Sequence, residues 1–361
     1  MADSVVLAAP RRVSLPGRLV ALVPGVLLLA AVGYTGKFLE GFLAEESRAH
    51  HLLLPNIEYV IWAIVLGLAV SNIVGVPAVF RAGVASYEFW LKTGIVLLGA
   101  RFLMGDLLHL GGISLLLVFF EVAFSLVFMT WLGRTFRLKP KLVSLLAIGS
   151  SICGVSAILA TCGAIEADDE DTSYAIAAIL ALGAISLVVF PLIGHALHLT
   201  DRAYGLWAGL AVDNTAESTA AGAIYSDAAG KVAVLAKTCR NAFIGFVVLA
   251  YVTYWASKGQ AEQVKNKPLF LWRKFPKFVL GFLLISVLAS VGVFTRAQTV
   301  SIGNLSRWAF LLAFAGVGLR SNLRELGRQG ARPFLVGLTG EVVIALITLG
   351  LVYGAGRMWA L

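Results

Sequence analysis

The chain has 361 residues, of which 59% are hydrophobic and only 14% are charged, and its mean hydropathy is +0.88. Soluble domains carry roughly a quarter charged residues, so this composition excludes an ordinary soluble protein and indicates several membrane spans. The net charge of +9 comes from basic residues in short loops between apolar runs, with no nucleic-acid-binding signature.

The first apolar run covers residues 19–34 and follows a polar segment with three arginines, Arg11, Arg12 and Arg18. A cleaved signal peptide is one interpretation. A retained anchor helix fits better, because the cleavage site would be poor and further spans follow. We therefore assign residues 1–56 to a cytoplasmic N-terminus, an anchor helix and an external loop.

Ten further apolar runs follow and predict, with the anchor, an all-α polytopic membrane protein of about eleven transmembrane helices. They cover residues 57–75, 86–105, 113–132, 142–165, 175–197, 204–225, 232–255, 278–294, 308–323 and 333–353.

Three loops rich in lysine and arginine, at residues 134–141, 258–277 and 320–332, set the orientation. If the spans alternate, a cytoplasmic N-terminus places all three loops inside, as the positive-inside rule requires. The acidic loop at residues 166–171 and the C-terminus then lie outside, in the periplasm. The expected location is the bacterial inner membrane.

An internal repeat divides the chain after the anchor. Residues 67–72 (GLAVSN) resemble residues 209–214 (GLAVDN), and a Lys-Thr pair follows each, at Lys92 and at Lys237. Two five-helix units are therefore expected, at residues 57–200 and 201–361. Because five is odd, the second unit would be inverted, the common plan of secondary transporters.

The stretch at residues 149–157 (GSSICGVSA) places glycines and serines inside an apolar run. Both residue types weaken a helix, and such a break survives in a membrane only inside protein or beside a water-filled cavity. We expect a discontinuous helix there. Its counterpart in the five-plus-five register is residues 315–322, so two broken helices would cross at the membrane midplane.

Residues 213–219 (DNTAEST) form the densest polar set inside an apolar run. Asp213 and Glu217 are four residues apart and repel one another, which favours a proton or a sodium ion beside them. They are the candidate ion-coupling residues. The alternative is that this segment is a re-entrant loop in water.

Other polar residues inside the spans have simpler interpretations. Lys92, Lys237 and Arg240 either compensate an anionic substrate or extend to the nearer interface. Glu121 and Glu341 are expected to join helices within the bundle. The three cysteines and five histidines show no metal-ligand spacing. No base pairs with the serines, so neither an enzyme nor a cofactor is expected.

The string at residues 149–158 (GSSICGVSAI), with residues 171–176, 191–194 and 205–209, is similar to the YeiH-type family of proposed sulfate exporters of the bacterial inner membrane. The resemblance implies the fold of bile-acid/sodium symporters and sodium/proton antiporters, with two crossed discontinuous helices beside a flanking panel. It also implies that residues around 149–157 and 213–218 line the site. The chain departs from the family at Asp213, where histidine is usual, and at Glu217, where glutamine is usual. Two added acids disfavour a bare dianion such as sulfate.

These features predict a secondary transporter of small anions in the lipid bilayer, and the expected substrate is a sulfur oxyanion or a small organic acid. Transport would proceed by alternating access with H⁺ or Na⁺ coupling. A homodimer is possible. A cation/proton antiporter without anion transport and a non-transporting sensor or scaffold stay open as alternatives. The expected substrate contacts are Ser150, Ser151, Cys153, Gly154, Ser156, Asn214, Thr215, Lys237 and Arg240.

Overall fold

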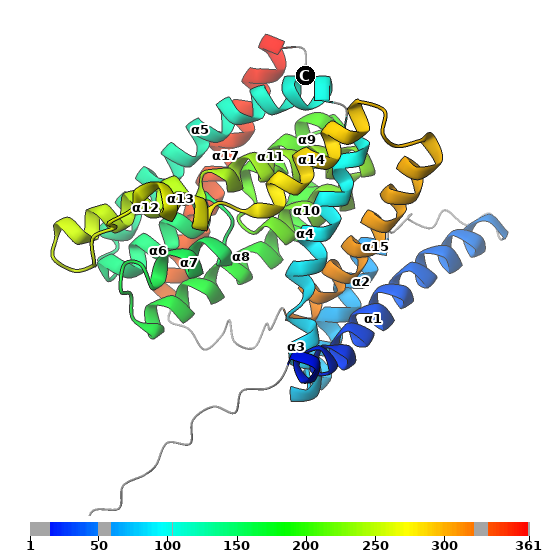
Figure 1. Cartoon of the computed structure of the whole chain (residues 1–361), viewed down its shortest axis with the longest axis horizontal. Coiled ribbons are helices and arrows are strands. Elements are labelled where there is room, and N and C mark those ends of the chain that lie inside the picture. Colours follow the sequence, from blue (N-terminus) through cyan, green and yellow to red (C-terminus); the bar gives the residue numbers. More distant parts are fainter. Residues whose placement is uncertain (1–14, 50–58, 103, 321–330, 360–361) are drawn as a thin grey trace, which may run out of the picture.

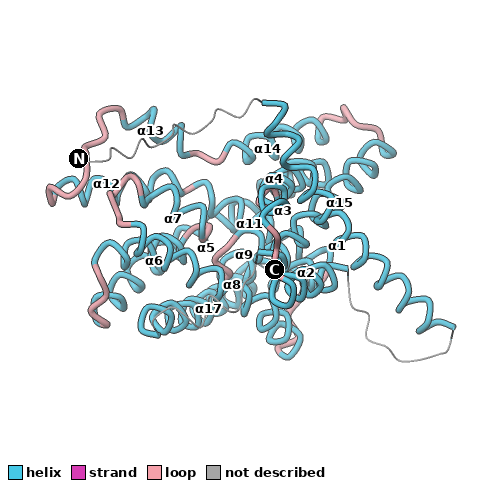
Figure 2. The backbone as a smooth tube through the Cα atoms, turned by 90° about the horizontal axis from the view of Figure 1, so that it is seen from below, coloured by secondary structure: helices cyan, strands magenta, loops and turns pink. Residues whose placement is uncertain are grey.

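The computed structural model describes residues 15–49, 59–102, 104–320 and 331–359, and this part of the chain consists of helices and short connections without strands (Figures 1 and 2). The helices are α1 (Leu15–Ala49), α2 (Tyr59–Ala69), α3 (Ala78–Val84), α4 (Tyr87–Leu98), α5 (Met104–Thr135), α6 (Pro140–Ser151), α7 (Val155–Cys162), α8 (Asp169–Ala196), α9 (Asp201–Ala211), α10 (Thr215–Tyr225), α11 (Asp227–Ala242), α12 (Ile244–Ser257), α13 (Lys267–Lys274), α14 (Lys277–Ser290), α15 (Arg296–Arg320) and α17 (Ala331–Trp359), with a π-helical turn η1 (Val70–Val74) and a 3-10 turn η2 (Gly99–Arg101).

Six helical segments among the described residues are long and apolar enough to cross a membrane. Two shorter apolar helices cover Tyr59–Val74 and Lys277–Ser290. In hydrocarbon a helix is favoured because it pairs its own backbone groups. The prediction of an all-helical membrane protein is confirmed, whereas the eleven predicted spans exceed the six long apolar helices among the described residues.

The helices pack as two groups (Figure 1). The panel group consists of α1, α2, α3, α4, α14 and α15, and α15 contacts both α2 and α4 extensively. The core group consists of α5 to α13 and α17. Each group draws on both halves of the sequence, so the packing groups differ from the sequence units 57–200 and 201–361, whose inverted relationship stays a prediction.

Helices α6 and α7 form a hairpin that returns to the end from which it entered. Lys141, at the start of α6, donates a hydrogen bond to the Glu166 carbonyl beyond α7, at 2.7 Å. Lys139 pairs with Asp171 at 3.3 Å and Glu170 at 3.4 Å, and these carboxylates raise the pKa of Lys139 above its usual value.

The predicted span at residues 142–165 is therefore wrong, because it is a re-entrant hairpin. The acidic loop at residues 166–171 lies beside the basic loop at 134–141 and not at the opposite end, since opposite charges attract. We call the end that contains these two loops the basic end.

Helices α9 and α10 form a second hairpin. The Tyr225 hydroxyl, at the end of α10, donates to the Leu199 carbonyl at 2.5 Å, and the Ser226 hydroxyl bonds to the Asp201 carboxylate at 2.7 Å. Both contacts join the exit of α10 to the entry of α9. The predicted span at residues 204–225 is thus also a re-entrant segment, as the alternative interpretation of residues 213–219 proposed, although the segment is buried in protein and not in water.

The two hairpins enter from opposite ends of the bundle and meet at their tips. Helix α8 joins their bases and has 28 residues, which corresponds to about 42 Å. At the tips, a Cβ added to Gly154 would lie 3.2 Å from the Cα of Asn214. The expected meeting of two interrupted helices therefore exists.

The partner of the first interruption is the tip at residues 212–214 and not residues 315–322. Helix α15 is continuous through Arg320, and Ser321 and Asn322 lie outside the described residues. Gly316 and Gly318 serve close packing instead: a Cβ on Gly318 would lie 2.2 Å from the Ile64 carbonyl oxygen of α2.

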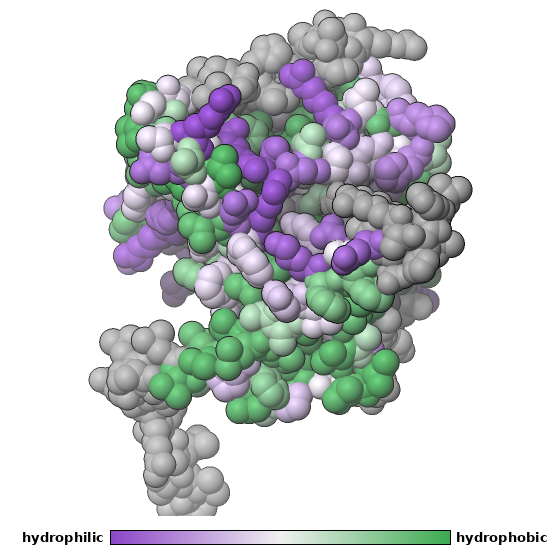
Figure 3. All heavy atoms as spheres, turned by 90° about the vertical axis from the view of Figure 1, so that its right-hand side faces the viewer, coloured by the Kyte–Doolittle hydropathy of each residue, from purple (hydrophilic) through white to green (hydrophobic). Residues whose placement is uncertain are grey.

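The outer surface separates polar from apolar regions. On the face drawn in Figure 3, hydrophilic residues gather in the upper part and hydrophobic residues in the lower part. Large apolar side chains such as Val127, Leu192 and Leu346 are more than 60% exposed. Such exposure suits a surface in contact with lipid.

Candidate functional site

The first arms of both hairpins end against two buried cations of α11. Arg240 donates to the Ser151 carbonyl at 2.7 Å, to the Ser150 carbonyl, and to the Leu210 carbonyl at 2.5 Å. Lys237 donates to the Val212 carbonyl at 2.5 Å. The last carbonyls of a helix lack intrahelical partners and carry partial negative charge. One helix therefore holds the ends of α6 and α9 together at the middle of the bundle.

The Arg240 guanidinium also pairs with the carboxylate of Glu121 on α5, at 3.2 Å, and both side chains are fully buried. Ser125 supports this carboxylate with a hydrogen bond of 2.6 Å. A guanidinium with a fixed fork of donors suits this junction, because it binds carbonyls from two helices and a carboxylate at once.

The second arms of both hairpins begin at a cavity of about 550 Å³. Val155 and Ser156 of α7 and Thr215 and Ala216 of α10 form part of its wall, together with Cys153 and Asn214 from the turns that precede these helices. Helix α4 of the panel group closes the opposite wall with Tyr87, Leu91 and Ile95. The cavity thus lies between the two groups of helices and touches both hairpin tips.

Two helix N-termini face this cavity. The turn into α7 places Gly154 at φ +68°, a conformation that favours glycine, and no side chain caps α7. The α10 start is ordered by Asn214, whose side chain accepts from the Ala216 amide at 3.2 Å, and by Asn241, which donates to the Thr215 hydroxyl at 3.1 Å. Exposed amides and the helix dipole make such N-termini favourable for anions.

The side chains at the cavity mouth are mostly basic. Lys92, Arg273, Lys274 and Lys277 line it, and among the described lining residues Glu88 is the one acid. Lys92 pairs with Glu88 at 3.1 Å, and Lys274 donates to the Ala160 carbonyl of α7 at 2.6 Å. Because the summed charge is positive, the mouth attracts anions.

A cluster of buried acids lies behind the tips. Neither carboxylate oxygen of Asp213 has a hydrogen-bond partner among the described residues, and the Glu217 carboxylate packs so closely on α8 that a Cβ on Gly183 would overlap it. Glu341 of α17, hydrogen-bonded by Ser186, interacts electrostatically with both acids. Three carboxyl groups therefore share one buried region.

The predicted site residues divide into three sets. Cys153, Ser156, Asn214 and Thr215 line the cavity, with Gly154 at the tip between them. Asp213 and Glu217 are buried behind it. Ser150, Ser151, Lys237 and Arg240 are also fully buried and lie outside the cavity wall, where the last two hold the hairpins and do not reach the interface as snorkelling would require.

Sequence reasoning did not include several cavity residues in the site. Tyr87, Glu88 and the cluster at Arg273, Lys274 and Lys277 come from distant segments. The sequence shows this basic cluster as part of the lysine- and arginine-rich loop at residues 258–277, but only the fold brings it to the hairpin tips. Glu341 was assigned to helix joining, and its partner Ser186 carried no distinguishing signal.

Comparison with known proteins places this architecture in a family. The family described as Conserved hypothetical protein 698 matches residues 24–337. The chain belongs to this family. A UPF0324 membrane protein of Nitratidesulfovibrio vulgaris is 37% identical over 322 residues, covering 87% of this chain and 88% of that protein. A UPF0324 membrane protein of Agrobacterium fabrum is 31% identical and covers 98% of each chain.

Some relatives in the UPF0324 group are longer. A UPF0324 membrane protein of Rhodopirellula baltica is 31% identical over 352 residues, which cover 93% of this chain but 63% of that protein. No solved structure matches the chain.

Proposed function

We propose that this protein is a secondary transporter of small anions that works by alternating access. The observation that carries the proposal is the convergence of two half-helix N-termini on a cavity with a basic mouth, at the boundary between two groups of helices. Half-helix ends near the midplane are the usual means by which transporters bind small ions. The resemblance to proposed sulfate exporters points to the same class.

The cavity fits an anion with an apolar body better than a bare dianion. Its volume of about 550 Å³ lies in the range of sites for small organic ligands. Leu91, Val155 and Phe278 give it apolar walls, while polar groups gather at the hairpin tips. A small carboxylate or sulfonate, with its charged end at the tips, satisfies both parts.

Charge balance supports coupling to protons. Apart from Asp171, which pairs with Lys139 at the basic end, the described residues include four buried carboxyl groups, on Glu121, Asp213, Glu217 and Glu341, and two buried cations, Lys237 and Arg240. An uncompensated charge at the bilayer centre costs about 2.5–3.5 kcal/mol on insertion scales. Two of the four carboxyl groups therefore hold protons or face a cation, and Asp213, which lacks a hydrogen-bond partner, is the first candidate for the coupling residue.

The two hairpins lead to a topology of nine membrane crossings, made by α1, α2, α4, α5, α8, α11 with α12, α14, α15 and α17. Basic residues at 134–141, 258–277 and 320 gather at one end, which the positive-inside rule assigns to the cytoplasm. The N-terminus then lies in the cytoplasm and the C-terminus outside, in a bacterial inner membrane.

In this orientation the cavity opens toward the cytoplasm, and ion pairs join the two groups of helices at the opposite end. There Asp227 of α11 pairs with Arg101 at 3.4 Å and with Arg307 at 3.5 Å, both from the panel group. From Asp227 to the cavity residue Asn241, α11 rises about 20 Å. Release of these ion pairs would let the two groups part at the far end, and alternating access follows from that exchange.

Flux measurements in proteoliposomes test the proposal. We expect saturable uptake of radiolabelled acetate, benzoate or sulfite, accelerated by a pH gradient and absent from empty liposomes. Sodium or proton exchange without any anion flux would instead establish a cation/proton antiporter. Absence of flux for all ions would favour a sensor or scaffold and would overturn the transporter assignment.

A further inference from the structure

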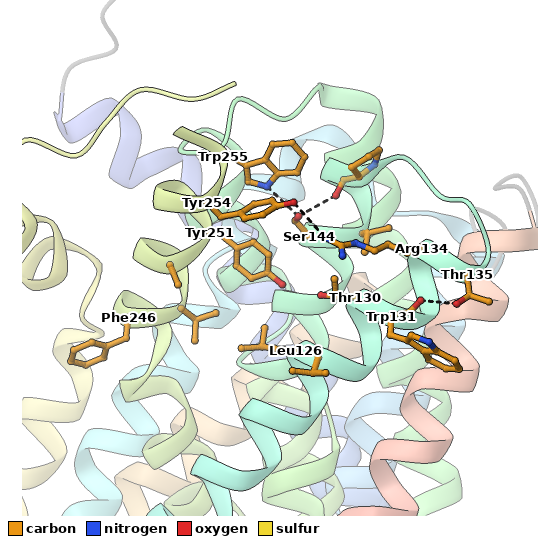
Figure 4. Close-up of a pocket in the computed structure, with 15 residues that line it drawn as sticks. Leu126, Thr130, Trp131, Arg134, Thr135, Ser144, Phe246, Tyr251, Tyr254 and Trp255 are labelled. Carbon is orange, nitrogen blue, oxygen red and sulfur yellow. Dashed lines mark hydrogen bonds between the residues drawn. The ribbon is translucent and has the colours of Figure 1, made fainter. Parts of the chain in front are cut away.

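A second cavity, of about 730 Å³, lies outside the proposed transport site, between α5, α6 and α12 (Figure 4). The part of the cavity farther from the basic end is apolar and is lined by Leu126, Val127, Phe246 and Val247. Val127 and Phe246 are 70% and 62% exposed, so this part is open to the surrounding lipid. We call this cavity the α5–α12 groove.

The other end of the groove is polar, aromatic and basic. Arg134 contacts the Tyr254 hydroxyl at 3.4 Å, and Trp255 donates to the Ser144 hydroxyl at 3.2 Å. Lys141 and Lys258 lie nearby, over the rings of Trp255 and Tyr254. Among the described residues that line the groove, none is acidic. Figure 4 shows Arg134, Ser144, Tyr254 and Trp255 grouped together, away from Phe246 and Leu126.

We propose that the α5–α12 groove binds one acidic phospholipid, with its phosphate at Arg134 and an acyl chain along Val127 and Phe246. Each part of the groove matches one part of this occupant: tryptophan and tyrosine suit the headgroup level, and the apolar wall suits the chain. Charge complementarity selects an anionic headgroup, since basic pockets at the cytoplasmic end of membrane helices bind such lipids.

The position of the groove connects the lipid to the first hairpin. Pro140, Val143 and Ser144 of α6 form part of its wall, and α6 ends at the carbonyls that Arg240 holds. A bound lipid therefore packs against the outer side of the hairpin whose tip borders the transport cavity. Lipid binding itself does not depend on the transport proposal.

Native mass spectrometry of the full chain, purified in detergent and mixed with phosphatidylglycerol or phosphatidylcholine of equal chain length, tests the proposal. We expect retention of one phosphatidylglycerol in preference to phosphatidylcholine. One basic residue near an anionic surface contributes about 1 kcal/mol, so Arg134→Gln should weaken phosphatidylglycerol binding about fivefold. Arg137→Gln makes the same charge change in the same loop outside the groove wall and should leave binding unchanged.

Two further arms separate the lipid from other sources of phosphate. Ala250→Trp, which fills the apolar part of the groove, should reduce binding of phosphatidylglycerol although the charge is intact. Glycerol phosphate, which lacks acyl chains, should not compete. Equal retention of both lipids by the unmodified protein, unchanged binding in Arg134→Gln, or full competition by glycerol phosphate would overturn the proposal.

Discussion

At the scale of single residues, Arg240 makes the contacts that hold the two hairpins together. It joins α11 to the ends of α6 and α9 and balances Glu121, all without exposure to solvent. From sequence alone, a charge two turns inside a span was compatible with substrate binding or with snorkelling. Its actual partners are main-chain carbonyls from segments about 30 and 90 residues away, and a residue pattern carries no record of such contacts.

Arg240→Gln should destabilise the protein strongly. Loss of one member of a buried ion pair leaves the other charge uncompensated, at a cost of about 3–5 kcal/mol. We expect a clear decrease in melting temperature in detergent, measured by intrinsic fluorescence. Adding Glu121→Gln should restore part of the loss, whereas the exposed change Arg296→Gln should have no effect. Equal melting temperatures for Arg240→Gln and Arg296→Gln would contradict this role.

The buried acids lead to a prediction about pH. Asp213→Asn and Glu217→Gln keep the size of each side chain but remove its proton site. If these acids carry the coupled proton, anion flux in each variant should lose its acceleration by a pH gradient, while flux without a gradient continues. The measurement is tracer uptake at several internal and external pH values. Gradient dependence that is identical in both variants and in the unmodified protein would exclude these residues.

At the scale of elements, the two hairpins account for the main difference between expectation and structure. Their apolar composition matches that of a span, so hydropathy predicted residues 142–165 and 204–225 as crossings. The glycine- and serine-rich stretch did locate the first interruption. The second lies at residues 212–214 and not at the predicted 315–322, although the polar run at 213–219 had a re-entrant loop as its alternative interpretation. The sequence did not show that the second arm of each hairpin runs back to the end where the first arm begins. That return depends on contacts such as Lys141 with Glu166 and Tyr225 with Leu199.

The tip of the first hairpin is testable with the two glycines that flank α7. Gly154 adopts φ +68° and touches Asn214, whereas Gly163, after the end of α7, has ordinary backbone angles and open space around it. Gly154→Ala places a side chain in a sparsely populated backbone conformation, at a cost of about 1–3 kcal/mol, and should impair flux. Gly163→Ala should be neutral in melting temperature and flux. Neutral behaviour of Gly154→Ala would argue against the described tip.

At the scale of the whole molecule, the sequence correctly predicted an all-helical membrane protein. It failed for the side on which residues 166–171 lie, because alternation was assumed for a segment that does not cross. The prediction also paired the first interruption with residues of α15, because it matched the two halves of the chain helix by helix as two units of five. The grouping of α2 and α4 with α15 follows from close glycine contacts, such as Gly67 with Gly318, which only the fold creates.

Cysteine labelling tests this topology directly. In a variant with Cys153, Cys162 and Cys239 replaced by alanine, single cysteines are introduced at Arg137, Glu170 and Asp201. Each cysteine shows on which side of the membrane its loop lies. Membrane-impermeant maleimide should label the first two from the same side and the third from the other side. Labelling of Arg137→Cys and Glu170→Cys from opposite sides would restore a crossing at residues 142–165 and contradict the hairpin.

The central claim is that the hairpin tips form an anion site with a positive potential. The most direct measurement uses Ser156→Cys in the same cysteine-free variant and compares its labelling rates by an anionic and a cationic methanethiosulfonate reagent of similar size. We predict that the anionic reagent reacts faster at residue 156, relative to its rate at an exposed control, Glu170→Cys, and that benzoate slows the reaction. Faster labelling by the cationic reagent, or no protection by benzoate or any other transported anion, would contradict the account.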